Sequence, residues 1–230
     1  MPRLHTFTFL FMVQSQISFE SGGKTIRLDC FLPDNCTQRL PTVIGLYGFG
    51  GDTSSMGDSS GQLADQGFAV YVLHFFDRTG RVEAEKSAIV MNFPVWMKTL
   101  WDGVSCVEQQ AYVDPQRIGL VGFSLGGYLA MCGSSIDPRI KAVVEFFGGF
   151  PKEMRLFMRR LCPTLILHGE NDTIIPISEA HYLQKLLEDK KIPHEIKVYP
   201  GTGHGFDGEV WQDARIRSLA FLQKYLTAKP

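Results

Sequence analysis

A serine flanked by glycines is the residue of this sequence best placed to do chemistry. Gly122, Ser124 and Gly126 form a Gly-x-Ser-x-Gly motif between the apolar run 117–123 and the helix-like segment 125–134. Such a motif predicts a sharp turn from a strand into a helix, because glycines lack the Cβ atoms that would clash there. The N-terminus of the helix then favours a developing negative charge. These features predict Ser124 as the nucleophile of an acyl-transfer reaction.

A second match to the motif surrounds Ser59, within the segment Gly57-Asp58-Ser59-Ser60-Gly61. The polar residues 52–55 precede it, so it follows no strand and lacks the context that gives the motif its meaning. Serine and aspartate are common where a helix begins, because their side chains accept hydrogen bonds from free backbone N–H groups. We therefore interpret Ser59 as a loop or helix-start residue.

A serine hydroxyl is a poor nucleophile at neutral pH and needs a base within hydrogen-bond reach. His204 lies in the glycine-rich segment 201–206, directly after the apolar run 195–199, where a flexible loop can bring an imidazole back over the edge of a sheet. His168 ends another apolar run, 164–168, where it suits a structural hydrogen bond. We predict His204 as the base.

The base in turn needs an acid that orients it. The loop 168–176 offers Glu170 and Asp172, and the apolar pair after Asp172 favours burial of that carboxylate, whereas Glu170 is expected to face solvent. Asp172 is the predicted acid, with Glu170 as the alternative. The chain order Ser124, Asp172, His204 is typical of α/β-hydrolases and differs from the orders in chymotrypsin-like and subtilisin-like proteases.

Acyl transfer also requires two N–H donors for the oxyanion that forms during attack. One is expected from Leu125, the residue after the nucleophile. The second is expected from the loop 47–51, which follows the first long apolar run and holds three glycines. We predict the N–H of Phe49 there, with that of Gly48 as the alternative.

The elements that must position these residues alternate along the chain. A hairpin is predicted first, with strands 17–19 and 25–32 joined at Ser21-Gly22-Gly23. Six short apolar runs follow, at 42–47, 69–74, 117–123, 140–147, 164–168 and 195–199, with helix-like segments between and after them at 56–66, 94–110, 125–134, 177–190 and 210–226. This alternation predicts an α/β fold with a mostly parallel sheet covered by helices on both faces, whose working site lies beyond the carboxyl ends of the strands.

Composition narrows the class of protein further. The 230 residues, 44% of them hydrophobic, suit one domain over 1–230, with residues 1–15 as an extra N-terminal or disordered segment. The net charge of −1 gives no basis for binding nucleic acid or a membrane surface. The odd number of cysteines, five, without a Cys-x-x-Cys pair, argues against a disulfide scaffold and a zinc site. We expect a cytoplasmic protein, monomeric or homodimeric.

Three motifs together resemble the dienelactone hydrolase family of the α/β-hydrolase superfamily: Gly-Phe-Ser-Leu-Gly-Gly at 122–127, His-Gly-Glu-Asn-Asp at 168–172 and Gly-His-Gly-Phe at 203–206. The resemblance extends from about 17 to 226 and implies an α/β-hydrolase fold, a triad of Ser124, Asp172 and His204, and hydrolysis of small esters or lactones without a metal or cofactor. Two positions depart from the founding members of the family. Position 124 is serine where they carry cysteine, and Tyr47 replaces their glutamate, so the chain resembles the carboxylesterase-like members.

Residues that bind substrate are harder to assign. Phe76, Trp96 and Trp211 lie near strand ends or in long connections, Tyr47 begins the predicted oxyanion loop, and Arg78 lies near the position where the family has an arginine for a substrate carboxylate. We predict these five as substrate-binding residues. The segment 150–161, with basic residues among apolar ones, is expected to form a solvated amphipathic helix or a partial lid. A small peptidase, a thioesterase and a non-catalytic ligand-binding protein are the alternative functions.

Overall fold

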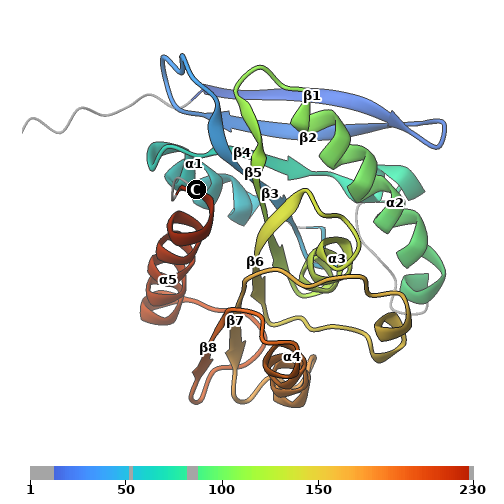
Figure 1. Cartoon of the computed structure of the whole chain (residues 1–230), viewed down its shortest axis with the longest axis vertical. Coiled ribbons are helices and arrows are strands. Elements are labelled where there is room, and N and C mark those ends of the chain that lie inside the picture. Colours follow the sequence, from blue (N-terminus) through green and yellow to red (C-terminus); the bar gives the residue numbers. More distant parts are fainter. Residues whose placement is uncertain (1–12, 52–53, 82–87, 228–230) are drawn as a thin grey trace, which may run out of the picture.

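The computed structural model describes residues 13–51, 54–81 and 88–227. Its centre is one eight-stranded sheet in the order β1-β2-β4-β3-β5-β6-β7-β8 (Figure 1). The strands are β1 (Val13–Ser21), β2 (Lys24–Leu32), β3 (Leu40–Leu46), β4 (Ala69–Leu73), β5 (Val113–Phe123), β6 (Ile140–Phe146), β7 (Thr164–Gly169) and β8 (His194–Tyr199). The predicted N-terminal segment 1–15 lies largely outside the described residues, and its last three residues belong to β1.

The strand directions divide the sheet into two parts. β1 and β2 form the predicted hairpin, and β2 also pairs antiparallel with β4. All the other neighbouring strands pair parallel. The predicted α/β fold with a mostly parallel sheet is confirmed, and the carboxyl ends of β3 to β8 share one edge of the sheet.

Helices cover both faces of this sheet (Figure 1). α1 (Ser54–Asp65) and α5 (Gly208–Leu226) lie on one face, and α2 (Ile89–Glu108), α3 (Leu125–Ser134) and α4 (Ile177–Asp189) lie on the other. The strands between them are therefore buried on both faces, and β3, β4 and β7 have no exposed residue. In the part of the chain that the structure describes, no helix is long and apolar enough to cross a membrane.

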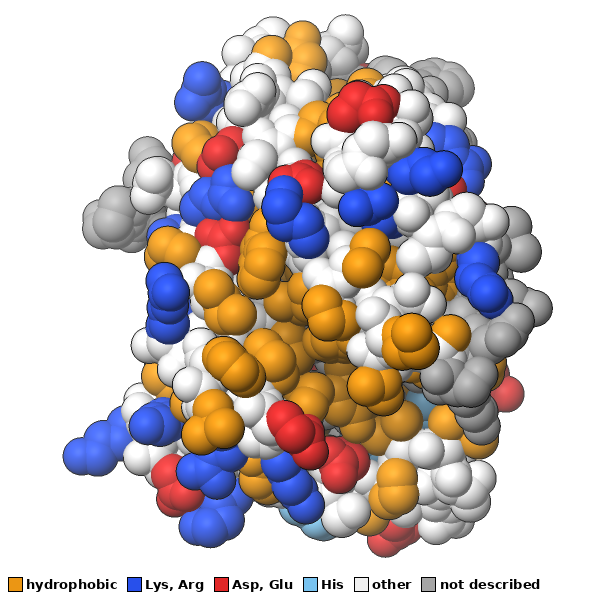
Figure 2. All heavy atoms as spheres, turned by 90° about the vertical axis from the view of Figure 1, so that its right-hand side faces the viewer, with side chains coloured by type: hydrophobic (Ala, Val, Ile, Leu, Met, Phe, Trp, Pro, Cys, Tyr) orange, Lys and Arg blue, Asp and Glu red, His pale blue; other side chains and the backbone are white. Residues whose placement is uncertain are grey.

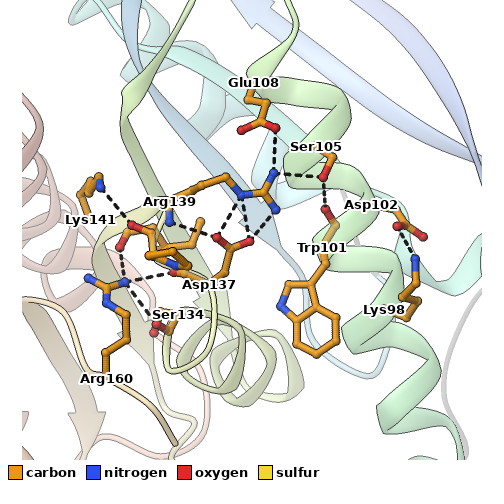
Figure 3. A network of polar contacts seen from close by, with 12 residues as sticks. Lys98, Trp101, Asp102, Ser105, Glu108, Ser134, Asp137, Arg139, Lys141 and Arg160 are labelled. Atoms are coloured by element: carbon orange, nitrogen blue, oxygen red, sulfur yellow. Dashed lines mark hydrogen bonds and ion pairs between the residues drawn. The ribbon is translucent and has the colours of Figure 1, made fainter.

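An arginine joins α2 to the turn between α3 and β6 (Figure 3). The guanidinium of Arg139 donates to Glu108 Oε1 at 2.9 Å and to Ser105 Oγ at 3.0 Å, both on α2. It also donates to Asp137 Oδ2 at 2.6 Å. Burial alone would raise the pKa of Asp137, but the hydrogen bonds and charge of Arg139 outweigh it and hold this pKa below its ordinary value. Arg139 thus fixes α2 and α3 on the same face.

The segment 150–161 does not form the predicted amphipathic helix. Its only helical part is the short 3₁₀ helix η3 (Lys152–Leu156). The backbone N–H groups of Arg159 and Arg160 both donate to the carbonyl of Ser135 at 3.0 Å, and the Arg160 side chain donates to the carbonyls of Ser134, Asp137 and Ile140. These bonds to the α3–β6 turn replace the bonds that a helix would need. No residue of this segment lines the cavity that contains Ser124.

Hydrophobic side chains gather around a hollow on the face shown in Figure 2. This face corresponds to the right-hand side of Figure 1, where η3 and the first turns of α2 lie. Both segments carry strongly exposed apolar residues, with Leu156 88% exposed and Met91 82% exposed. Within 150–161, Leu156 and Phe157 are exposed, whereas Phe150 and Leu161 are buried in the core. Apolar residues of this segment thus point both into the core and into solvent without forming one face of a helix.

Candidate active site

Ser124 occupies the turn between β5, which ends at Phe123, and α3, which begins at Leu125. Its backbone has φ 53° and ψ −115°, a conformation that costs a non-glycine residue about 1–3 kcal/mol. The turn is tight, because a Cβ on Gly122 would overlap the backbone of Gly126 and one on Gly126 would overlap the carbonyl of Leu46. The N–H of Ser124 donates to the carbonyl of Phe146 on β6 at 2.9 Å. The surrounding sheet thus holds the serine in this conformation.

The side chains of Ser124, His204 and Asp172 form a hydrogen-bonded chain. Ser124 Oγ lies 3.0 Å from His204 Nε2, and His204 Nδ1 lies 2.7 Å from Asp172 Oδ2. His204 lies on the loop after β8. This loop packs so closely against β7 that a Cβ on Gly169 would overlap the backbone of Thr202. The ring of Phe147 packs edge-on against the imidazole, with 4.8 Å between centroids. The structure therefore brings the three predicted residues together in the order that a nucleophile, its base and an acid require.

Asp172 is held so that one oxygen is reserved for His204. Its Oδ1 accepts hydrogen bonds from the N–H groups of Ile174 and Ile175, both at 2.8 Å, which leaves Oδ2 to face the imidazole. The carboxylate itself is fully buried. The alternative acid, Glu170, is exposed and accepts a 3.4 Å bond from the N–H of Gly201. The structure places Asp172, and not Glu170, against the base.

His168 supports the loop that carries Asp172. Its Nε2 donates to the carbonyl of Ile175 at 2.8 Å, while the buried Nδ1 has no hydrogen-bond partner. Burial lowers the pKa of this histidine below its ordinary value, so the ring is neutral with the proton on Nε2. His168 has the structural hydrogen bond expected of it from the sequence.

The predicted oxyanion loop lies beside the serine. Gly48 and Phe49 line the same cavity as Ser124, and a Cβ added to Gly48 would lie 3.4 Å from the Ser124 Cβ. A bond of 3.1 Å from the N–H of Gly51 to the carbonyl of Gly48 closes this loop into a tight turn. The N–H of Leu125 belongs to the first residue of α3, directly after Ser124 in the chain. Both predicted donors thus come from backbone adjacent to the serine, and their role stays a prediction.

The cavity above Ser124 has a volume of about 230 Å³ and is mostly apolar. Two of the five predicted substrate residues, Tyr47 and Trp211, line it. The Tyr47 hydroxyl accepts a 3.3 Å bond from the N–H of Phe76, and burial raises the pKa of this phenol, so it is neutral. Phe123 and Phe147 also line the cavity. Both lie at the carboxyl ends of strands, where side chains in a parallel sheet reach the site, and the sequence analysis did not include them.

The other three predicted substrate residues lie elsewhere. Phe76 and Trp96 are 1% and 0% exposed and pack on each other in the core, with 5.1 Å between ring centroids. The Trp96 indole donates to Thr79 Oγ1 at 3.3 Å, which satisfies its polar atom away from the cavity. The guanidinium of Arg78 lies over Gly22 at the turn of the N-terminal hairpin. The structure therefore corrects these three expectations, because core packing and the hairpin hold the side chains.

A buried glutamate lies directly under the nucleophile turn. Glu145 of β6 is 0% exposed, and its Oε1 accepts a hydrogen bond from the N–H of Gly148 while Oε2 has no partner. Its Cγ would lie 3.3 Å from a Cβ on Gly127 of α3, so the side chain fills the space beneath the first turn of that helix. Burial raises the pKa of Glu145 to about 8, although the Gly148 N–H acts to lower it. The carboxyl is thus mostly neutral at pH 7 in the folded protein.

This raised pKa predicts a pH dependence of stability that Glu145→Gln removes. The unfolded carboxyl ionises near its ordinary value of 4.5 and the folded one near 8, so Glu145 costs stability progressively as the pH rises between these values. The slope of this loss is at most about 1.4 kcal/mol per pH unit. We expect Glu145→Gln to gain stability relative to wild type from pH 5 to pH 8, measured by urea unfolding at each pH. Parallel curves for the two proteins would show that Glu145 does not titrate in this way.

Within residues 13–51, 54–81 and 88–227, no group of three or more His, Cys, Asp or Glu side chains is arranged to hold a metal ion.

A family model and curated relatives both connect this chain with dienelactone hydrolases. The model of the dienelactone hydrolase family matches residues 28–216. A carboxymethylenebutenolidase homolog from Rattus norvegicus is 27% identical over 199 residues, which are 77% of this chain and 79% of the relative. The homolog from Homo sapiens is 28% identical over 185 residues, which are 71% of this chain and 74% of the relative.

A solved structure shares the fold. The crystal structure of a dienelactone hydrolase-like promiscuous phosphotriesterase from metagenomic libraries aligns with a TM-score of 0.81 and 14% identity, over 93% of this chain and 98% of that one. At this identity the likeness shows the fold alone, and that fold is the α/β-hydrolase fold seen here. With the family match over most of its length, the chain belongs to the dienelactone hydrolase family.

Proposed function

We propose that this protein is a serine hydrolase that cleaves carboxylic esters and lactones through an acyl-enzyme intermediate. The observation that carries the proposal is the chain of hydrogen bonds from Ser124 Oγ to His204 and from His204 to Asp172, at 3.0 and 2.7 Å. Membership of the dienelactone hydrolase family supports hydrolysis as the reaction class. The relatives named as carboxymethylenebutenolidase homologs support lactones as one substrate class.

In the first half of the reaction, His204 Nε2 accepts the proton of Ser124 Oγ as this oxygen attacks the carbonyl carbon of the ester. The negative charge on the carbonyl oxygen is stabilised by the N–H groups of Leu125 and Phe49. The imidazolium then donates its proton to the leaving alcohol, and the acyl group stays on Ser124. Asp172 stabilises the imidazolium and keeps Nδ1 protonated, because its free oxygen faces that nitrogen.

In the second half, a water molecule takes the place of the alcohol. His204 removes its proton as the water attacks the acyl carbon, and the same two N–H groups stabilise the second oxyanion. Collapse of this intermediate breaks the bond to Ser124 Oγ, which regains its proton from His204. A lactone follows the same steps, except that its leaving alcohol remains attached to the acyl group.

The cavity favours uncharged substrates. Its lining is largely aromatic and apolar, with Tyr47, Phe49, Phe147 and Trp211 around Ser124. Arg78, the residue that the family resemblance connects with a substrate carboxylate, instead contacts the hairpin turn at Gly22. A small neutral ester or lactone fits this environment better than a dianionic one.

The proposal is tested by initial rates on p-nitrophenyl esters from acetyl to octanoyl and on a neutral aromatic lactone, with matched p-nitroanilides and thioesters. Ester and lactone turnover with slow anilide cleavage is the expected result, whereas faster anilide or thioester cleavage would make the protein a peptidase or a thioesterase. A fluorophosphonate, followed by peptide mass mapping, should label the peptide that carries Ser124 and not the one that carries Ser59. The absence of label and turnover would favour a non-catalytic ligand-binding protein.

A further inference from the structure

A second cavity, of about 320 Å³, lies between α1 and α5 over the sheet. Its base is formed by Val121 and Phe123 of β5 and Phe146 of β6. The side walls come from the two helices and include Gln62 of α1 and Trp211, Gln212, Ile216, Leu219 and Leu222 of α5.

Two side chains separate this second cavity from the catalytic cavity. Phe123 and Trp211 line both of them. The Trp211 ring packs against Phe123 and Phe146 with 6.1 and 5.7 Å between centroids, and Trp211 belongs to the first turn of α5. The half-buried Trp211 indole therefore stands at the boundary between the cavity that contains Ser124 and the one between the helices.

The lining of the second cavity suits an apolar chain whose far end reaches water. The residues toward the sheet are apolar, including Val121, Leu219 and Leu222. Among the polar residues on the helices, Gln62 and Gln212 are exposed. The buried hydroxyl of Ser218 is already satisfied, because it donates to the carbonyl of Ala214 at 2.7 Å. An alkyl or aryl group would lose water contacts at the base of the cavity without leaving buried polar groups unpaired.

Volume gives an independent reason for a joint site. Ligand pockets in proteins span about 300–1,000 Å³, and the catalytic cavity alone, at about 230 Å³, lies below this range. With the second cavity, of about 320 Å³, the combined volume of the two cavities lies well within the range of ligand pockets. A substrate with one long apolar arm can thus keep that arm out of water, with its scissile carbonyl at Ser124, if the arm passes Trp211 into the second cavity.

Resting on the proposed esterase function, we propose that the cavity between α1 and α5 binds the distal part of an apolar arm of the substrate, and that Trp211 sets how easily the arm enters it. The substrate class is therefore an ester or lactone with an extended alkyl or aryl substituent. Replacement of Trp211 by alanine widens the passage, whereas bulk added inside the second cavity shortens the arm that fits.

The first test compares decanoyl with acetyl p-nitrophenyl esters as a ratio of kcat/KM. Trp211→Ala should raise this ratio by about tenfold, since burial of two more methylene groups supplies that much. Leu219→Trp, which fills the second cavity, should lower the ratio by about tenfold. Equal ratios in wild type and both variants would overturn the proposal.

Two further variants keep this test decisive. Ala220→Trp introduces the same indole side chain at an exposed position of α5 outside the cavity and should leave the ratio unchanged. If Leu219→Trp fails to fold, Ile216→Trp replaces it, because Ile216 lines the cavity while being 61% exposed. A similar fall in the ratio for Ala220→Trp and the filling variants would also overturn the proposal.

The second test needs no turnover. Binding of linear methyl ketones of four to twelve carbons to the Ser124→Ala protein is measured by calorimetry, with and without Leu219→Trp. Affinity should rise with chain length, and Leu219→Trp should remove the gain for the longer ketones. Affinities that ignore chain length or position 219 would overturn the proposal. If ketones follow the expected pattern while no ester or lactone is cleaved, the cavity assignment stands and the proposed function fails.

Discussion

Replacement of Ser124 by alanine should lower kcat/KM for ester hydrolysis by roughly 10⁴- to 10⁶-fold. The reason is geometric: Ser124 Oγ is the group hydrogen-bonded to His204 Nε2, at 3.0 Å, and it faces the cavity with the oxyanion loop on its other side. Without this oxygen no acyl-enzyme forms, and only binding and oxyanion stabilisation remain. The measurement is the initial rate on p-nitrophenyl acetate with enzyme concentration established by absorbance.

Ser124→Gly separates loss of chemistry from loss of structure. Glycine adopts the φ of 53° at this position without strain, so this variant should be at least as stable as wild type while losing the same activity. Thermal unfolding of the three proteins provides the comparison. Activity near the wild-type value in either variant would mean that another residue is the nucleophile.

The order and positions of the elements were largely predictable, because the core strands are short apolar runs covered on both faces. α3 begins and ends where the pattern placed it, and the hairpin turn falls at Gly22 and Gly23 as expected. α2 begins at Ile89, before the predicted start at Pro94, so the proline lies inside the helix rather than at its beginning. Exposed Val90 and Met91 in this first turn gave no apolar face by which to recognise it.

The candidate site was predictable to the extent that local motifs position its residues. Glycine-rich turns after strands mark Ser124 and His204, and the parallel sheet then brings their loops to one edge. The aromatic residues around the site carry no such signal. Whether Phe76 or Phe147 lines the cavity depends on packing between distant elements, as in the contact of Phe76 with Trp96 of α2.

Arg78 illustrates the same limit for a charged residue. The sequence places it shortly after β4, close to the edge of the sheet where Ser124 and His204 also lie. Its direction is decided by the 3₁₀ helix η1 (Phe75–Thr79), which turns it toward Gly22 of the N-terminal hairpin. The hairpin reaches this position through the pairing of β2 with β4 and through the ion pair of Arg27 with Asp77, so the contact of Arg78 with Gly22 is not encoded in local spacing.

Asp172→Asn should lower kcat by about 10⁴-fold while leaving the fold intact. Oδ1 of residue 172 accepts hydrogen bonds from the N–H groups of Ile174 and Ile175, so the asparagine must keep its carbonyl oxygen there. Its NH₂ group then faces His204 Nδ1, which can no longer carry a proton and must accept instead. The neutral imidazole is forced to protonate Nε2, the nitrogen that has to accept the proton of Ser124.

Glu170→Gln is the matched control for Asp172→Asn. Glu170 lies two residues away on the same loop, is exposed, and contributes one long bond to the N–H of Gly201 that a glutamine oxygen can also accept. The Glu170→Gln enzyme should therefore keep kcat within about twofold of wild type, since an exposed pair contributes little. The measurement is the steady-state kcat of both variants, compared with that of the wild-type enzyme. If Glu170→Gln is the more damaging change, or Asp172→Asn retains most of the activity, Asp172 does not orient the base and the tautomer argument fails.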